Sequence, residues 1–475
     1  MLYLALGRHL DWGFWSNPPL IGAVSWLVQH TLGDSLFAAR FFPSIVGGLL
    51  VWMTGQMALG LGGGRFAALL SAAVVFVSPA GLALASLFQP VPFDVLCWAT
   101  ATWLTINYLR TQKPHWLWAL GLTVGAGLMN KYTVVFLVLG LAVGLLLTVH
   151  RRVFMRREMW QAAVMAVLVA LPNLVWQWRH GFPVVTHMRE LSENQLANVE
   201  ISSFLGDQFL LYGLGFLLWL PGVIWLFWSR DWRVMGWFFV SVLFVLAVLH
   251  GKAYYTLGIY PVAIAAGGVF WEGVCRRIWQ KTALAVGLVG LSLPLVPAAI
   301  PVFPIEKLER YFQWLAYEKG VASTVRWETG QLEKLPQDYA DMLGWPELGA
   351  LVDAALAGEI LQNCLVYCEN YGQAGAAQRF SRQARAAQVV SFSDSYRLWA
   401  PDRLAPQVQT LVYVNDELGD DVAALFADIR KVGSVGNPLA RERDATVWVC
   451  RAPRGSFPDF WAKRVAEVKT EIGLK

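Results

Sequence analysis

Charged residues are scarce in this chain of 475 amino acids. Asp, Glu, Lys and Arg together make up 15% of it, whereas soluble proteins carry about 25%. Apolar residues make up 56%, a composition that excludes an ordinary globular protein and requires lipid as a solvent. The imbalance is local, because residues 41–303 form apolar runs with short polar gaps and residues 306–475 have the composition of a soluble protein.

Several signatures of soluble enzymes and nucleic-acid-binding proteins are also missing. The five cysteines show no metal-ligand spacing, and Cys364 and Cys368 share a predicted strand, which sets them about 13 Å apart and out of disulfide reach. We expect buried thiols. The net charge of +5 lies in short loops without a basic block, so no nucleic-acid partner is expected. The sequence has no phosphate-binding loop, nucleophile elbow or internal repeat.

Apolar runs of about 17 to 25 residues can span the roughly 30 Å hydrocarbon core of a bilayer, and the chain has about ten. They cover residues 41–60, 66–86, 91–109, 116–130, 132–150, 160–178, 207–228, 234–250, 255–273 and 282–303. Alternate gaps carry the basic residues, for example Arg151 and Arg152. The positive-inside rule makes those gaps cytoplasmic, and the opposite gaps and both termini then face outward.

Three regions follow, and the fold class is a polytopic α-helical membrane protein with a C-terminal soluble α/β domain. Residues 1–40 form an outer-face loop in which residues 18–32 suit an interfacial helix. Residues 41–303 form the transmembrane domain, and residues 304–475 form the extracytoplasmic domain. Its expected strands are 363–368, 388–392, 410–414 and 445–450, and its expected helices are 336–357, 371–384, 419–430 and 456–470.

Few charges lie at membrane depth. A charged side chain there is energetically costly unless it is paired or hydrated, so such residues are candidates for function. Asp94 sits at the outer start of a span behind Pro90 and Pro92. It is either an acid/base or metal-contacting carboxylate or an interfacial helix N-cap.

Lys131 interrupts apolar sequence at the outer face. An ammonium group there suits phosphate, and the alternative is a snorkelling lysine that separates two spans. Lys252, with Tyr254 and Tyr255, forms a second outward cluster, for which the alternative is an ordinary basic residue in an aromatic belt.

Two further outward segments are polar. One holds His187, Arg189 and Glu190, and most of its side chains could simply be solvated; the other holds Arg8 and Asp11. We expect these gaps to converge on one site at the outer membrane face. A transporter would instead place polar residues at the bilayer midplane, with interrupted helices and an internal repeat.

The order of several motifs resembles a known family. The segments are GRHLDWGFWSNPPLIG, GDSLFAARFFP, FQPVPFD, GLMNKYT, NLVWQWRHGFP, HGKAYYTLGIYP, LPQDYADMLGW and ENYGQAGA. They are similar to bacterial relatives of protein O-mannosyltransferases and of the lipid A aminoarabinose transferase. These are multi-pass glycosyltransferases of the GT-C fold that use polyprenyl-phosphate sugars.

The resemblance implies inverting transfer of a sugar from a polyprenyl-phosphate donor to a hydroxyl of a glycan, lipid or protein at the outer face of the cytoplasmic membrane. In such enzymes basic residues steady the leaving phosphate. The corresponding candidates here are Lys131, Lys252 and Arg8 with Tyr254 and Tyr255. Asp94 is the candidate catalytic carboxylate near the acceptor, where a divalent cation could assist.

The family pattern also places an Asp-Glu pair and a first membrane helix before LYLALGRHLDWGF, and the chain begins at Met1. A start that lies too far downstream is expected, with a truncated inactive form as the other interpretation. Two other function classes stay open: a transporter or flippase of lipid-linked substrates, and a relative that binds polyprenyl phosphate without chemistry.

Overall fold

The computed structural model describes residues 1–194, 196 and 199–471. The chain divides into two compact units. The helical unit comprises residues 17–176 and 189–304, and the α/β unit comprises residues 1–16, 177–188 and 305–475. The segment 177–188, which belongs to the α/β unit, therefore interrupts the helical unit in the sequence.

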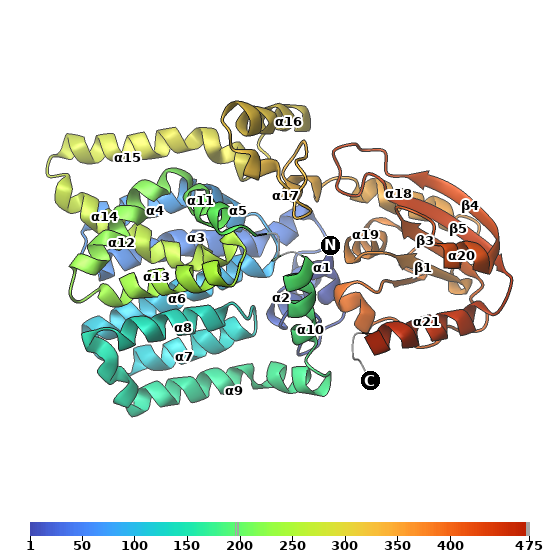
Figure 1. The fold of residues 1–475 in the computed structure, drawn as a ribbon, viewed down its shortest axis with the longest axis horizontal. Helices are drawn as coiled ribbons and strands as arrows, with labels where there is room; N and C mark the ends of the chain where they lie inside the picture. Colours follow the sequence, from blue (N-terminus) through green and yellow to red (C-terminus); the bar gives the residue numbers. More distant parts are fainter. Residues whose placement is uncertain (195, 197–198, 472–475) are drawn as a thin grey trace. The chain divides into compact units, whose positions relative to one another are not determined.

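The helical unit is a bundle of apolar helices (Figure 1). Each apolar run in the sequence overlaps one or two of them. Their bounds are α2 Leu20–Thr31, α3 Leu36–Gly60, α4 Arg65–Val77, α5 Pro79–Leu84, α6 Pro90–Thr111, α7 His115–Leu128, α8 Val134–Leu146, α9 Arg157–Arg179, α11 Ile201–Leu211, α12 Phe216–Trp228, α13 Arg233–Val248, α14 Tyr260–Val274 and α15 Ile278–Ser292. The interfacial helix expected over residues 18–32 corresponds to α2.

Length and apolar composition identify the candidate spans among the described residues. Four helices qualify, or up to six when two bent pairs each count as one span. The other apolar runs form shorter or more polar helices, such as α4 and α13. The structure therefore confirms a multi-pass helical membrane unit, but by this measure it has four to six candidate spans and not the ten expected from the sequence.

Helices α12 and α14 are in backbone contact at two glycines. A Cβ atom on Gly222 would lie 2.0 Å from the carbonyl oxygen of Ala263, and one on Gly267 would lie 2.0 Å from that of Leu218. Small residues at such crossings allow apolar helices to associate through close packing in lipid. These two glycines therefore set the separation of α12 and α14.

The α/β unit is built on a five-stranded sheet in the order β2-β1-β3-β5-β4. Its strands are β1 Cys364–Cys368, β2 Gln388–Val390, β3 Thr410–Asn415, β4 Phe426–Ser434 and β5 Thr446–Pro453. Strand β1 pairs in parallel with β2 and β3, with Val366 opposite Val389 and Val412. Strand β5 runs antiparallel to β3 and β4.

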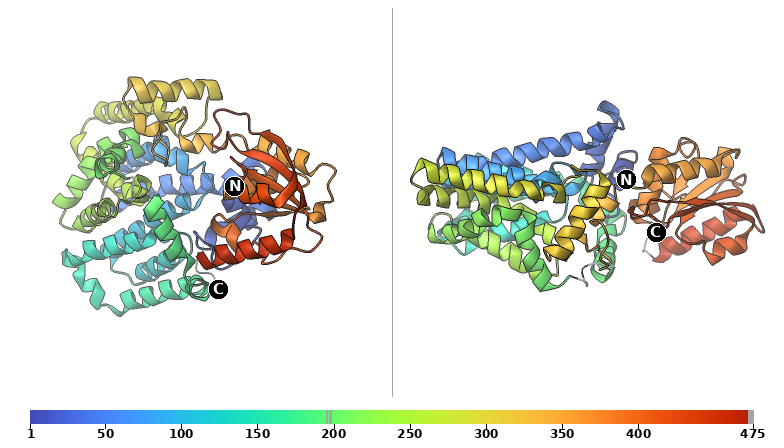
Figure 2. Two further views of the ribbon diagram at one scale, coloured as in Figure 1. Left: turned by 45° about the vertical axis from the view of Figure 1, so that its right-hand side comes forward. Right: turned by 90° about the horizontal axis from the view of Figure 1, so that it is seen from above.

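Helices lie on both faces of this sheet (Figure 2). They are α18 Trp345–Leu356, α19 Tyr371–Phe380, α20 Asp420–Leu425 and α21 Phe457–Glu471. Trp461 and Val465 of α21 join the core formed by the side chains of Leu365, Tyr413 and Trp448. The remaining helices of the unit are α1 Leu2–Leu6, α10 Pro183–Asn194, which continues into the helical unit, α16 Ile305–Gln313 and α17 Gln337–Ala340.

The expected helix over residues 419–430 was wrong in its second half. Helix α20 ends at Leu425, and β4 begins at Phe426. The strand forms because it pairs with β5, with Ile429 opposite Cys450. Pairing with a distant strand overrides local helical preference, which is a weak determinant.

The segment after α19 is held by one carboxylate, Asp353 of α18. Its oxygens accept hydrogen bonds from the Ser381 hydroxyl at 2.5 Å, the Gln383 N–H at 2.9 Å and the Arg382 N–H at 3.1 Å. Burial opposes ionisation of Asp353, but these hydrogen bonds outweigh it and hold the pKa of the carboxyl below its usual range. The ionised form is thus part of the folded structure.

The Asp353→Ala variant is expected to lower the free energy of unfolding of the α/β unit by about 2 kcal/mol, because two backbone N–H groups lose their acceptor. Since the folded-state pKa is depressed, the stabilisation is full above about pH 4, the unfolded value, and is lost as pH falls through the folded value. Chemical denaturation at neutral and acidic pH measures both effects. Equal stability of Asp353→Ala and the parent protein at neutral pH would contradict this assignment.

Candidate functional site

Asp94 lies in the second turn of α6 and is 5% exposed. Its Oδ1 accepts a hydrogen bond from the Trp98 indole at 3.2 Å, and its Oδ2 accepts one from the Thr133 hydroxyl at 2.7 Å. Gln89, not Asp94, is the N-cap of α6. The N-cap interpretation of Asp94 is therefore wrong, because its oxygens accept from side chains and not from the first N–H groups of the helix.

The four residues Asn130 to Thr133 connect α7 to α8, and three of their side chains bind other segments. The Asn130 amide donates to the Pro90 carbonyl at 2.9 Å. The Tyr132 hydroxyl donates to the Asn173 side chain at 2.8 Å. With the bond from Thr133 to Asp94, these contacts fix the connection against α6 and α9 and leave Lys131 as the one charged side chain in it.

The Lys131 ammonium lies over two aromatic rings. Its Nζ is 5.1 Å from the centroid of the Tyr254 ring and 4.9 Å from that of Tyr255. The two tyrosine rings are perpendicular neighbours, 4.7 Å apart. Both come from the short 3₁₀ helix Ala253–Ile259, whose N-cap is Lys252. The quadrupoles of both rings attract this cation electrostatically, in addition to its interaction with solvent.

Three charges meet at this point of the helical unit. Burial lowers the pKa of Lys131 to about 8, the negative charge of Asp94 raises it, and the positive charge of Lys252 lowers it further. The structure therefore brings together Asp94, Lys131 and Lys252, which come from three distant segments of the sequence. A half-buried cation with a second cation nearby is suited to binding an anion.

A buried polar cluster supports the 3₁₀ helix that carries the tyrosines. The Oε1 of Gln208 accepts hydrogen bonds from the Thr256 hydroxyl at 2.7 Å and the Tyr260 hydroxyl at 2.6 Å. The side-chain amide of Gln208 donates to the Phe204 carbonyl at 2.8 Å. Helix α11 therefore fixes the residues that follow Tyr254 and Tyr255.

The other candidate site residues lie elsewhere in the fold. Arg8 and Asp11 belong to the α/β unit and are exposed. Helix α10 carries His187, the exposed Arg189 and the half-buried Glu190; the first belongs to the α/β unit and the other two belong to the helical unit. Their predicted roles in lining the site stay predictions.

A divalent cation beside Asp94 stays a prediction. The Asp94 carboxylate already accepts two side-chain hydrogen bonds. Over the described residues, no group of three or more His, Cys, Asp or Glu side chains is arranged to hold a metal ion. No step of the proposed mechanism is therefore assigned to a metal.

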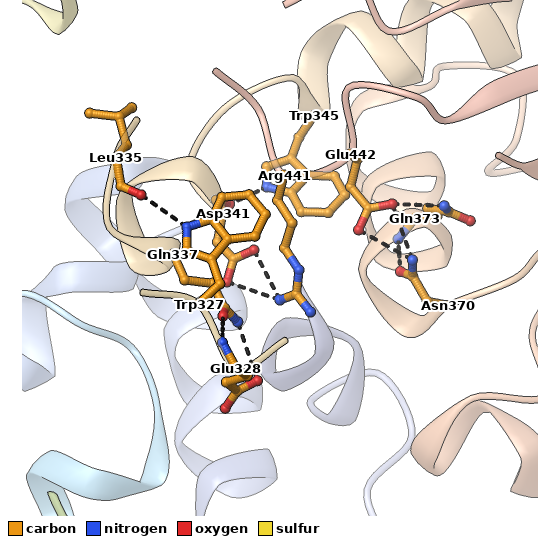
Figure 3. A network of polar contacts seen from close by, with 10 residues as sticks. All are labelled: Trp327, Glu328, Leu335, Gln337, Asp341, Trp345, Asn370, Gln373, Arg441 and Glu442. Carbon is orange, nitrogen blue, oxygen red and sulfur yellow. Dashed lines mark hydrogen bonds and ion pairs between the residues drawn. The ribbon is translucent and has the colours of Figure 1, made fainter. Parts of the chain in front are cut away.

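The α/β unit has its own polar network, which joins the motifs LPQDYADMLGW and ENYGQAGA (Figure 3). Arg441 pairs with Asp341 at 3.1 Å, and the next residue, Glu442, accepts hydrogen bonds from Asn370 and from Gln373, the latter at 2.7 Å. Burial raises the pKa of Asp341, and the Arg441 charge opposes that rise. These side chains satisfy one another, so the network holds the loop between β4 and β5 against α17 and α19.

Three residues of the Asp94 cluster were not identified from the sequence: Trp98, Asn130 and Thr133. Trp98 follows Asp94 by four positions, a spacing that places two helical side chains on one face. Asn130 and Thr133 flank Lys131. These spacings were available in the sequence. The contacts of Asn130 and Thr133 with α6 depend on tertiary packing, which the sequence does not reveal.

Comparison with known proteins gives a family match over part of the chain and a fold match over most of it. Residues 16–176 match the family model of dolichyl-phosphate-mannose-protein mannosyltransferases. The structure of ArnT from Cupriavidus metallidurans in the apo state superposes with a TM-score of 0.67 at 14% identity, over 94% of this chain and 92% of that one. The chain has an ArnT-like GT-C fold. The family resemblance inferred from the sequence motifs is confirmed.

Two further proteins that this chain resembles are informative. ArnT from the same organism bound to undecaprenyl phosphate superposes with a TM-score of 0.63 at 15% identity, over 94% of this chain and 92% of that one. The lipid A galacturonosyltransferase RgtD of Rhizobium johnstonii is 27% identical over 330 residues. That match covers 64% of this chain and 66% of RgtD, just under two thirds of its length.

Proposed function

We propose that this protein is a membrane glycosyltransferase that moves a sugar from a polyprenyl-phosphate donor to an acceptor hydroxyl, with inversion at the anomeric carbon. The supporting observation is the cluster of Lys131, Lys252, Tyr254 and Tyr255 beside the buried Asp94 in the helical unit. An ammonium held among apolar helices suits the phosphate of a lipid-borne donor, because a charge at this depth is costly without such a partner.

Lys131 and Lys252 are assigned to the donor phosphate. As the bond between the anomeric carbon and the phosphate oxygen breaks, the leaving polyprenyl phosphate keeps the electron pair and gains negative charge. A preorganised cation stabilises that developing charge most strongly in the transition state. Tyr254 and Tyr255 hold the ammonium over their two rings, so little reorganisation is needed when donor binds.

We assign a positioning role to Asp94. Both of its oxygens accept hydrogen bonds from Trp98 and Thr133, and its charge acts on Lys131. It thereby fixes the segment Asn130 to Thr133 and favours the charged form of Lys131. Its acid/base role at the acceptor stays a prediction; in either case the acceptor hydroxyl must pass its proton to a base while it attacks.

The name of RgtD supports a finer proposal for the acceptor. A lipid A-type glycolipid would present its hydroxyls at the surface of the same membrane that holds the donor. On the basis of the basic residues in alternate loops, we propose that the Lys131 connection and the α/β unit face the outer side of the cytoplasmic membrane. The sugar proposed on the same basis is a uronic acid.

The test is donor turnover by the purified full chain in nanodiscs. With undecaprenyl-phosphate galacturonic acid and lipid A present, release of undecaprenyl phosphate together with a new glycosidic bond on lipid A is expected. Movement of the donor across a vesicle bilayer without a new bond would instead identify a flippase. Binding of undecaprenyl phosphate with no turnover of any polyprenyl-phosphate sugar would identify a non-catalytic relative.

The activity is expected to fall above about pH 8. Lys131 is charged below its pKa of about 8 and loses its attraction for phosphate as the pH rises through that value. The fall should be seen in kcat/KM for the donor, which reports the free enzyme, and less in kcat, because bound phosphate keeps the ammonium charged. In Lys131→Arg, which stays charged, the alkaline fall should disappear; the same fall in this variant would assign it to another group.

A further inference from the structure

The α/β unit contains a cavity of about 320 Å³ outside the Lys131 cluster. It is lined by residues 384–389 at the start of β2, by the last turns of α19 and by the N-terminal segment. The lining residues are Arg8, Gln378, Ala384, Arg385, Ala387 and Val389. Two are arginines and none is acidic, so the lining carries charge of one sign.

Backbone contacts hold the two arginines at the rim. The Nη1 of Arg8 donates to the Gln378 carbonyl at 3.4 Å, and the Nη2 of Arg385 donates to the Arg379 carbonyl at 3.2 Å. Each guanidinium has five N–H donors, and the bonds named here use one from each. Such forks suit an oxyanion with two or more accepting oxygens.

The N-terminal segment is fixed against the rest of the α/β unit next to Arg8. The His9 ring stacks on Trp399 with centroids 4.0 Å apart. The Trp15 N–H donates to the Ser395 hydroxyl at 3.2 Å, and the Arg397 guanidinium lies 4.4 Å from the Trp15 ring centroid. The residues that follow Arg8 therefore hold it at the cavity that Arg385 also lines.

The positive charge of the Arg385 guanidinium at the cavity rim is not neutralised by an ion pair. Across the part of the chain that the structure describes, no carboxylate lies within ion-pair distance of its guanidinium. The nearby carboxylate, Asp353, is occupied by Ser381, Arg382 and Gln383. Burial lowers the pKa of His9, and the charge of Arg8 lowers it further.

We propose that this cavity binds a phosphate group through Arg8 and Arg385. Ala384, Ala387 and Val389 supply the apolar part of the lining beside the two guanidinium groups. The volume leaves room for an attached sugar or glycerol. The phosphate is carried either by the glycolipid acceptor or by the headgroup of a membrane lipid. In the first case this inference rests on the proposed function, and the α/β unit is an acceptor-binding domain.

This assignment gives Arg8 a partner different from the donor phosphate expected from the sequence. Arg8 and Arg385 belong to the α/β unit, and Lys131 and Lys252 belong to the helical unit. Two phosphate sites with separate residues make separate predictions, because substitutions in one should leave binding at the other unchanged.

The test is direct binding to the detergent-purified full chain without donor, so it does not depend on transfer activity. Glucosamine 1-phosphate probes a sugar-borne phosphate, and dioctanoyl phosphatidate probes a lipid headgroup. The Arg8→Gln/Arg385→Gln double variant is compared with Arg382→Gln, an exposed arginine of the same segment outside the cavity lining. Thermal unfolding confirms that each variant is folded, and the single variants replace the double variant if it is not.

The double variant should bind its ligand about tenfold more weakly, whereas Arg382→Gln should bind like the parent protein. This pattern with glucosamine 1-phosphate identifies a sugar-borne phosphate. The same pattern with phosphatidate alone identifies a lipid headgroup. Binding of neither ligand, or equal losses in the double variant and in Arg382→Gln, would overturn the proposal.

Discussion

Replacing Lys131 by alanine is expected to lower kcat/KM for a polyprenyl-phosphate sugar by about 10²–10³-fold, the usual effect of removing one preorganised group that stabilises transition-state charge. The ammonium lies over Tyr254 and Tyr255 and is the charged group that the fold fixes at this position. The protein should remain folded, because the flanking bonds of Asn130, Tyr132 and Thr133 are untouched.

Initial rates of polyprenyl phosphate release in nanodiscs measure this effect. Lys113→Ala is the matched control, since Lys113 is an exposed lysine in the connection between α6 and α7 and should retain the parent rate. Lys131→Arg should retain part of the activity, because the charge is kept while the compact ammonium is replaced by a wider planar group. Near-parent activity of Lys131→Ala would refute the assigned role.

The second large effect is expected in folding of the helical unit. In Gly222→Val, the new side chain would collide with the Ala263 carbonyl and with the backbone nitrogen of Gly267, where even a Cβ atom would lie 2.0 and 2.6 Å away. Because both obstacles are backbone atoms, α12 and α14 must separate. The cost should exceed about 3 kcal/mol, and little monodisperse protein should be recovered from detergent.

Size-exclusion chromatography of a fluorescent fusion measures the folded fraction directly. Gly287→Val in α15 is the control, because a Cβ atom there meets no atom within 4 Å, and its folded fraction should equal that of the parent. If Gly222→Val were equally well folded, the close approach of α12 and α14 would be contradicted.

The sequence predicted the helical unit well because lipid imposes a simple rule. A backbone in hydrocarbon must satisfy its hydrogen bonds internally, so each long apolar run corresponds to one or two helices. The sheet was less predictable. Strand β4 has no regular apolar alternation, and its burial alternates poorly as well. It exists because Phe426 to Ser434 pair with β5, a long-range contact that local preference does not reveal.

The charged members of the candidate site were also predictable because of the lipid environment. Asp94, Lys131 and Lys252 stand out because charges are rare among apolar runs. The neutral partners do not stand out. Thr133 and Trp98 resemble many other residues in these helices, and their contacts with Asp94 arise only when the connection between α7 and α8 packs against α6.

The folded conformation of the segment Asn130 to Thr133 is expected to favour binding of phosphate. Its neutral side chains anchor it to Pro90, Asn173 and Asp94. These anchors hold the ammonium of Lys131 over two tyrosine rings before donor arrives, which lowers the cost of ordering it on binding. Neutral side chains of one segment thus hold the ammonium of Lys131 beside the charges of Asp94 and Lys252.

The most direct measurement is an electron cryo-microscopy structure of the full chain with undecaprenyl phosphate. We expect the phosphate to lie within hydrogen-bonding distance of the Lys131 ammonium, beside Lys252 and the Tyr254 and Tyr255 rings. A well-resolved phosphate bound to other residues, with Lys131 still lying over the two tyrosines and no phosphate near it, would contradict the central claim.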